Sequence, residues 1–134
     1  MRSRPVTASL RKGRPALAAV ESTIALLEQS GLFNAGRGAN RQLDGVQRMD
    51  AAIMEGARLN AGAVASIEGI VHPITAARLV MEETGHVLLV GPFAGRFAQY
   101  GISNYRPRDR LRRSASPLSC LNGRSSRFIA TSRN

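Results

Sequence analysis

The stretch from Leu32 to Gly56 most constrains how this chain can fold, because it crowds asparagine, glycine and aspartate into a short space. Glycine adopts backbone conformations that other residues avoid, and clusters of glycine and asparagine are typical of loops. The fold must therefore place an ordered loop here, between the elements on its two sides. We expect this loop to hold backbone groups in conformations that helices and strands do not provide.

A helix is predicted immediately before the loop, over about residues 15–29. Pro15 stands where the first turn of a helix accepts proline, and Gly31 lies just past the predicted end. Between them, apolar residues recur at the spacing of one helix face: Leu17, Val20, Ile24 and Leu27.

Two strands are predicted after the loop. Asp44-Gly45 is a hairpin-turn signal, and the residues that follow it, 46–54, are predicted to be the returning strand. Residues 59–70 form a second candidate strand, rich in alanine and glycine. Small residues inside a strand indicate that another element packs closely against it.

The remaining elements complete a mixed pattern. Residues 72–85 predict a helix with Pro73 near its start, 86–91 predict a buried strand, and 92–101 predict a short helix. Helices and strands in this order predict an α/β or α+β fold, with strands antiparallel around the Asp-Gly turn.

The formal net charge of +10 is concentrated at the two ends of the chain. Residues 1–14 carry +5, residues 15–103 carry −2, and residues 104–134 carry +7. The chain therefore divides into a basic N-terminal segment, one globular region of ordinary charge, and an Arg/Ser-rich tail. The tail lacks an apolar period, which predicts disorder.

Several classes of protein and site are disfavoured. No apolar run approaches the roughly 20 residues of a membrane span, so we expect no membrane association. A single cysteine, Cys120, excludes an internal disulfide framework, and cytoplasmic location is expected. His72 and His86 have no partners at metal-ligand spacing, and His72 before Pro73 is interpreted as a helix-start residue.

The acidic residues near the loop allow two interpretations. Asp44 is most simply a turn residue. Asp50 and Glu55 could form a carboxylate pair for acid–base chemistry, but a strand-edge and turn interpretation is favoured.

A set of longer motifs resembles a known family. The segments Ala16–Glu28, Phe33–Gly38 ("FNAGRG") and Asp44–Gly56 ("DGVQRMDAAIMEG") occur in that order, and Ala61–Gly91 and Gly95–Ile102 continue the pattern. Together they resemble the plant-type asparaginase and isoaspartyl peptidase family of Ntn-hydrolases, over about Ala16 to Ile102.

The resemblance implies the first half of a four-layer αββα sandwich and a hydrolase that is made as a precursor. Members of the family cleave themselves to expose an N-terminal threonine. Its hydroxyl attacks the side-chain amide of asparagine or a β-aspartyl peptide bond. A free α-amine has a pKa near ~8, so it can serve as the base for the adjacent hydroxyl.

The resemblance also nominates site residues within the loop. Asn34 is expected to support the nucleophile, while catalytic and substrate-binding residues are not expected within these 134 residues. A structural sodium ion is expected rather than an organic cofactor, because a ring of carbonyl oxygens suits a hard monovalent cation. The main-chain carbonyls nominated for it belong to Leu27, Glu28, Ser30, Phe33, Ala35 and Arg37.

Departures from the family pattern limit what this chain is expected to do alone. The family's nucleophile lies in a G-T-x-G segment, and none of the threonines stands in such a setting: Thr7, Thr23, Thr75, Thr84 and Thr131. We therefore expect an α-subunit fragment that is inactive unless a threonine-bearing β-subunit half is supplied, and that self-associates through uncovered apolar surface. The alternative is a basic nucleic-acid-binding accessory protein on a remnant fold.

Overall fold

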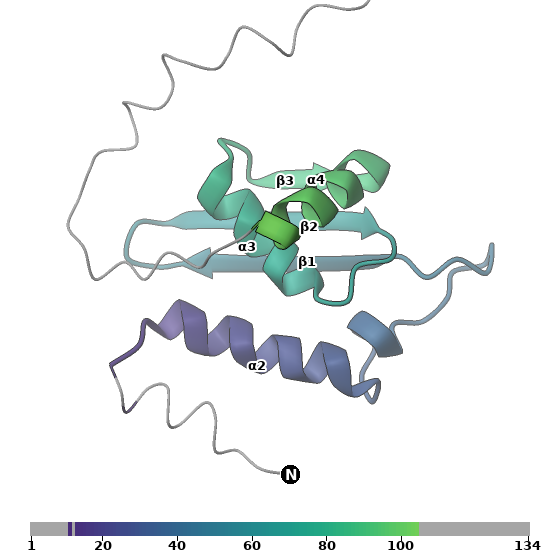
Figure 1. Cartoon of the computed structure of the whole chain (residues 1–134), viewed down its shortest axis with the longest axis horizontal. Coiled ribbons are helices and arrows are strands. Elements are labelled where there is room, and N and C mark those ends of the chain that lie inside the picture. Colours follow the sequence, from purple (N-terminus) through teal and green to yellow (C-terminus); the bar gives the residue numbers. More distant parts are fainter. Residues whose placement is uncertain (1–10, 12, 105–134) are drawn as a thin grey trace, which may run out of the picture.

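The computed structural model describes residue 11 and residues 13–104, and it is an α+β structure (Figure 1). Predictions for residues 1–10, residue 12 and residues 105–134, among them the prediction of disorder in the tail and the remarks on Cys120, lie outside the described residues. The elements, labelled as in Figure 1, are α2 (Ala16–Ser30), η1 (Gly36–Gly38), β1 (Met49–Glu55), β2 (Asn60–Ile67), α3 (Pro73–Glu83), β3 (Leu88–Val90) and α4 (Gly91–Asn104).

The strands of the described region form a mixed sheet in the order β1-β2-β3. β1 and β2 are antiparallel, with Ala52 opposite Ala63, and they are joined by a turn over residues 56–59. β2 and β3 are parallel, with Ala63 opposite Leu88. The antiparallel pairing was expected, but its position around the Asp-Gly turn was wrong. That turn carries an isolated bridge between Arg41 and Gln47 instead of a strand pair.

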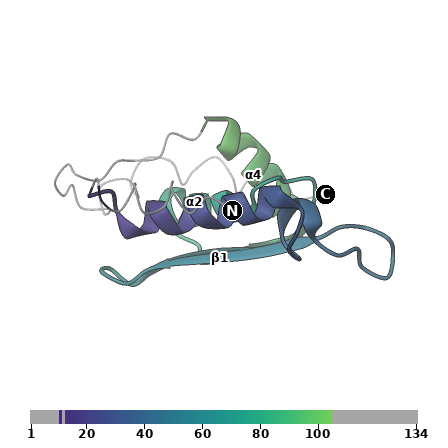
Figure 2. The ribbon, with the colours of Figure 1, turned by 90° about the horizontal axis from the view of Figure 1, so that it is seen from below.

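Helices α2, α3 and α4 all lie on one face of the sheet, which Figure 2 shows almost edge-on. The core lies between these two layers. Its fully buried side chains include Val64 and Ile67 from β2 and Ile74 and Val80 from α3. Buried alanines of the same cluster, such as Ala98 of α4, have small side chains that let the backbones approach one another.

The close packing predicted for the second strand is confirmed at Gly62. A Cβ atom at this position would lie 2.3 Å from the carbonyl oxygen of Ala77 and 2.5 Å from the backbone nitrogen of Met81. Since both atoms belong to the backbone of α3, no side-chain movement could make room. Gly62 therefore sets the distance between β2 and α3.

A bulge interrupts the β1–β2 ladder at the end nearer the loop. The register shifts between Met49 and Ala51, and Ser66 on the facing strand adopts a φ of 54°. The Asp50 carboxylate accepts a hydrogen bond from the Ser66 backbone N–H at 2.7 Å. This bond holds a conformation that is unusual for a residue with a side chain.

The prediction that residues 86–91 form a buried strand was wrong in its burial. Leu88 and Val90 of β3 are 52% and 56% exposed, whereas Leu89 packs against the core. A continuous apolar run is typical of a strand that is covered on both faces. In the part of the chain that the structure describes, only one face is covered.

Candidate functional site

The glycine- and asparagine-rich loop begins where α2 ends. The helix stops at Ser30 and Gly31 follows it, as the sequence predicts. The Ser30 hydroxyl donates to the Leu27 carbonyl at 2.7 Å and accepts from the Leu32 backbone N–H at 3.2 Å. These two bonds turn the chain sharply out of the helix and direct it back along the helix end.

Two glycines allow the loop to fold closely, one against the helix and one against the first residues of the loop. A Cβ on Gly36 would lie 2.5 Å from Glu28 Cβ, and one on Gly38 would lie 2.3 Å from the Phe33 carbonyl oxygen. Neither position could accept a side chain without moving the backbone. The F-N-A-G-x-G pattern therefore has a steric cause, which is the close approach of the loop to the helix at Gly36 and to its own first residues at Gly38.

The Asn34 side chain joins two parts of the loop by a hydrogen bond. Its side-chain oxygen accepts a hydrogen bond from the Asn40 backbone N–H at 2.8 Å. The residue lines a cleft of about 260 Å³ together with Glu28, Arg48 and Asp50. The side chain nominated for a supporting role thus lies in a polar cleft, between the loop and the start of β1.

The carbonyl groups nominated for sodium belong to the last turn of α2 and to this loop. Four of them already accept hydrogen bonds: Leu27 from Ser30 Oγ at 2.7 Å, Phe33 from the Ala35 N–H at 2.7 Å, Ala35 from the Gly38 N–H at 3.1 Å, and Arg37 from Gln47 Nε2 at 3.3 Å. A carbonyl oxygen has two lone pairs, so one that accepts a single hydrogen bond keeps capacity for a cation. All six nominated groups are oxygen donors, the type that a hard cation prefers.

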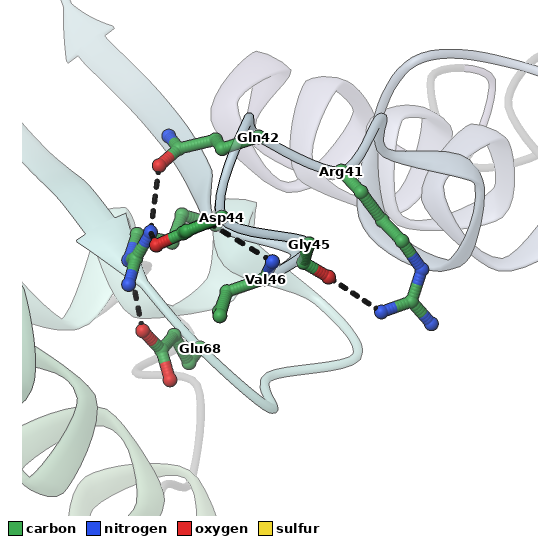
Figure 3. Close-up of polar contacts among 7 residues, drawn as sticks. Arg41, Gln42, Asp44, Gly45, Val46 and Glu68 are labelled. Carbon is green, nitrogen blue, oxygen red and sulfur yellow. Dashed lines mark hydrogen bonds and ion pairs between the residues drawn. The ribbon is translucent and has the colours of Figure 1, made fainter.

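The turn after the loop is built around Asp44 (Figure 3), which pairs with Arg48. Asp44 accepts from the Val46 N–H at 3.0 Å, which confirms its interpretation as a turn residue. Arg48 Nη1 donates to Asp44 at 2.6 Å and to Gln42 at 2.8 Å, and its Nε donates to Glu68 at 2.9 Å. The hydrogen bond from Arg48 is the main reason that the Asp44 pKa is lowered.

The turn is connected to the loop through Gln47. Its side-chain nitrogen donates to the Ala39 carbonyl at 2.7 Å and to the Arg37 carbonyl at 3.3 Å. Loop and turn therefore form one hydrogen-bonded unit between α2 and β1.

A model of the asparaginase family matches residues 3–116, which extends beyond the segment carrying the motifs quoted above. The chain belongs to this family. It is 54% identical over 99 residues to a plant-type L-asparaginase of Pyrococcus horikoshii, covering 73% of this chain and 32% of the relative. It is 49% identical over 99 residues to an isoaspartyl peptidase of Salmonella typhimurium, with the same two coverages of 73% and 32%.

The similarity extends to eukaryotes. An isoaspartyl peptidase/L-asparaginase of Danio rerio is 42% identical over 92 residues, which are 69% of this chain and 30% of the relative. The chain thus spans about a third of the length of the curated relatives it matches.

Asp50 and Glu55 of this asparaginase-family chain do not form a carboxylate pair. Asp50 caps the bulge through Ser66, while Glu55 stands opposite Asn60 at the far end of β1. Side chains five positions apart in a strand also point to opposite faces. The strand-edge and turn interpretation is therefore the correct one.

Two buried charged residues behind the loop were missed by sequence reasoning. Glu28 is 2% exposed and Arg78 is 4% exposed. Arg78 pairs with Glu21 of α2 and, at 3.0 Å, with Glu82 of its own helix. A signal was present, because Glu21 and Glu28 follow Leu17 and Ile24 by four residues each and so share the apolar stripe of the helix.

Burial raises the pKa of Glu28 to about 7, although a hydrogen bond from the Ile74 backbone N–H opposes the shift. Glu21 adds a smaller contribution in the raising direction.

The predicted start of α3 is confirmed, with His72 at the N-cap and Pro73 as the first helical residue.

Two broader expectations concern membranes and metals. Among the described residues, no helix combines the length and apolar character that crossing a bilayer requires. The same residues contain no group of three or more His, Cys, Asp or Glu side chains that could hold a metal ion.

Proposed function

We propose that this chain is the α-subunit portion of an isoaspartyl peptidase or L-asparaginase-like hydrolase. The reaction would be hydrolysis of the side-chain amide of asparagine or of a β-aspartyl peptide bond. The observation that carries the proposal is the family match combined with identities near one half over the region that contains the Asn34 loop. The names of the relatives support both substrate classes and do not separate them.

The chemistry requires a nucleophile that we place outside these 134 residues, on the same polypeptide or on a separate one. An N-terminal threonine there would use its α-amine as base and its hydroxyl as nucleophile. Within this chain, the loop unit would support the threonine half. Asn34 supplies an amide in a polar cleft, and its bond to Asn40 keeps the loop closed.

Activity measurements with and without a threonine-bearing half test this proposal. The chain would be co-expressed with the remaining two thirds of the Pyrococcus horikoshii relative as a separate polypeptide. Ammonia released from asparagine and aspartate released from β-aspartyl dipeptides would be measured. Loss of a covalent nucleophile costs factors of roughly 10⁶ in protease examples, so we expect hydrolysis only in the complemented sample.

Two controls define the outcome. Replacing the threonine of the complementing polypeptide by alanine should abolish the hydrolysis, and Asn34→Ala should lower it. Hydrolysis by the purified chain alone, lost on Asn34→Ala, would refute the assignment of the nucleophile to residues outside the chain.

We also propose that the carbonyls of the loop hold a sodium ion that stiffens the site. Support comes from Gly36, which lets the loop lie against the helix end, and from the set of main-chain carbonyl oxygens gathered in this segment. An ion that binds only the folded chain raises its melting temperature. Sodium chloride should therefore stabilise the chain more than choline chloride at equal ionic strength, and equal melting curves would refute the site.

A further inference from the structure

Glu28 is a buried carboxylate with no arginine or lysine partner among the described residues. Its side chain is 3% exposed, and the buried arginine nearby, Arg78, pairs with Glu21 and Glu82 instead. A buried charge is expected to have specific partners, because the loss of its hydration destabilises the fold unless other contacts replace it. The contacts of Glu28 therefore indicate what it does.

The first contact reaches a distant element. Glu28 Oε1 accepts a hydrogen bond from the Ile74 backbone N–H at 3.0 Å, across 46 positions of sequence. Ile74 is the second residue of α3, directly after Pro73, and no side-chain hydrogen bond from the N-cap residue His72 caps this helix. Glu28 of α2 thus supplies the cap that α3 does not obtain from its own sequence.

The second contact joins Glu28 to His72 at a distance slightly too long for a hydrogen bond. Glu28 Oε2 and His72 Nδ1 lie 3.6 Å apart, and both atoms are buried without another hydrogen-bond partner. Each atom could satisfy the other, because a ring nitrogen and a carboxyl oxygen can share one hydrogen bond. A small approach would let a protonated Nδ1 donate to Oε2.

The backbone of the same residue supports the loop. Gly36 lies against Glu28 Cβ and its carbonyl oxygen, closely enough to exclude any side chain. Glu28 also lines the cleft that contains Asn34. One residue therefore contacts the start of α3 with its carboxylate and the Asn34 loop with its backbone.

We propose that Glu28 and His72 form a buried latch that fixes the loop of residues 31–40 relative to α3, which makes Glu28 a positioning residue for Asn34. The value of this latch for catalysis rests on the proposed function. The contacts themselves do not, so they are tested on the chain without any activity measurement.

Hydrogen exchange of the full chain, read by mass spectrometry, tests the carboxylate. Glu28→Leu keeps a side chain of similar length but removes both oxygens. We expect exchange in residues 31–40 and at Ile74 to rise roughly tenfold, the equivalent of one hydrogen bond to a charged group, while the β1–β2 amides stay protected. Glu28→Gln keeps an acceptor for Ile74 and a donor for His72, so exchange should rise less than about threefold. Glu55→Leu is the matched control and should leave the loop unchanged.

His72→Phe tests the second half of the latch and serves if Glu28→Leu fails to fold. It keeps the ring but removes Nδ1, so exchange in residues 31–40 should rise, whereas His86→Phe should not change it. Loop protection at the original level in Glu28→Leu or in His72→Phe would overturn the latch. Loss of protection in Glu28→Gln equal to that in Glu28→Leu would overturn it as well. Hydrolysis by the complemented enzyme can fail without affecting any of these outcomes, so the two proposals are separable.

Discussion

The two faces of the sheet differ in what covers them. The face under α2, α3 and α4 carries the core, and its helix layer contains buried charges, including Glu28 and Arg78. The opposite face has no covering element among the described residues and exposes Met54, Leu88 and Val90 to 58%, 52% and 56%. On most protein surfaces that face water, charged side chains are exposed and large apolar side chains are buried. The helical layer therefore closes one face of the sheet, whereas the other face leaves apolar side chains exposed among the described residues.

Substitutions on the helical side should lower the free energy of unfolding of the chain, measured by urea denaturation, more than substitutions on the open face.

Arg78→Met should have the largest effect. It leaves the carboxylate of Glu21, whose side chain is 13% exposed, without its cation. Removing one partner of a buried ion pair costs about 3–5 kcal/mol. Arg58→Met, at an exposed position in the β1–β2 turn, should leave the denaturation midpoint unchanged. A small effect at Arg78 would mean that α2 and α3 are not held together by this pair.

The pH dependence of stability should come next. Burial raises the Glu28 pKa from 4.5 to about 7 in the folded chain, so folded molecules hold a proton that unfolded ones release within this range. Stability from this group is fully present below pH 4.5 and is lost as the pH rises through about 7. The loss amounts to at most about 3 kcal/mol, at 1.36 kcal/mol for each pKa unit.

The measurement requires a sodium-free buffer, because a cation on the loop would favour the ionised carboxylate. Glu28→Gln removes the titrating group, so its stability should not fall over the same range. An equal fall in this variant would assign the pH dependence to another group.

How much of these two faces could be predicted depends on how local the cause is. Helices α2 and α3 follow from apolar spacing, an early proline and a glycine or threonine end, all read within one segment. The β1–β2 hairpin does not, because its turn has no Asn-Gly or Asp-Gly signal and places Leu59 at a φ of 55°. The stronger Asp-Gly signal instead serves a loop turn, where Gln47 bonds to Ala39 eight positions back and Arg48 bonds to Glu68 twenty positions ahead.

The site shows the same division. The glycines and Asn34 of the loop are found through a motif, because their role depends on neighbours in sequence. The burial of Glu28 and Arg78 depends on partners 46 and 57 positions away, and a charged residue is expected at the surface until such partners are known.

Adjacent positions of β2 offer a direct comparison of the faces at a smaller scale. In Gly62→Val the new side chain meets the backbone of α3, with the Ala77 carbonyl oxygen 2.3 Å from its Cβ. Overpacking of this kind costs about 1–3 kcal/mol. Ala63→Val adds a similar side chain one position along, facing away from the helices, and should be near neutral. Equal losses at the two positions would contradict the assignment of an open face.

The open face itself should give the smallest effect on folding. Leu88→Lys with Val90→Lys replaces two half-exposed side chains of β3, and surface changes usually stay within about 0.5 kcal/mol. We expect the unchanged chain to form oligomers through this apolar face and its free strand edges, and the double variant to form fewer of them by light scattering. A monomeric unchanged chain would refute this use of the face. If the face receives the threonine half, the same double variant should also lose complementation while its unfolding curve stays unchanged. Loss of complementation without loss of stability would separate a docking surface from a core, which no change on the helical side can do.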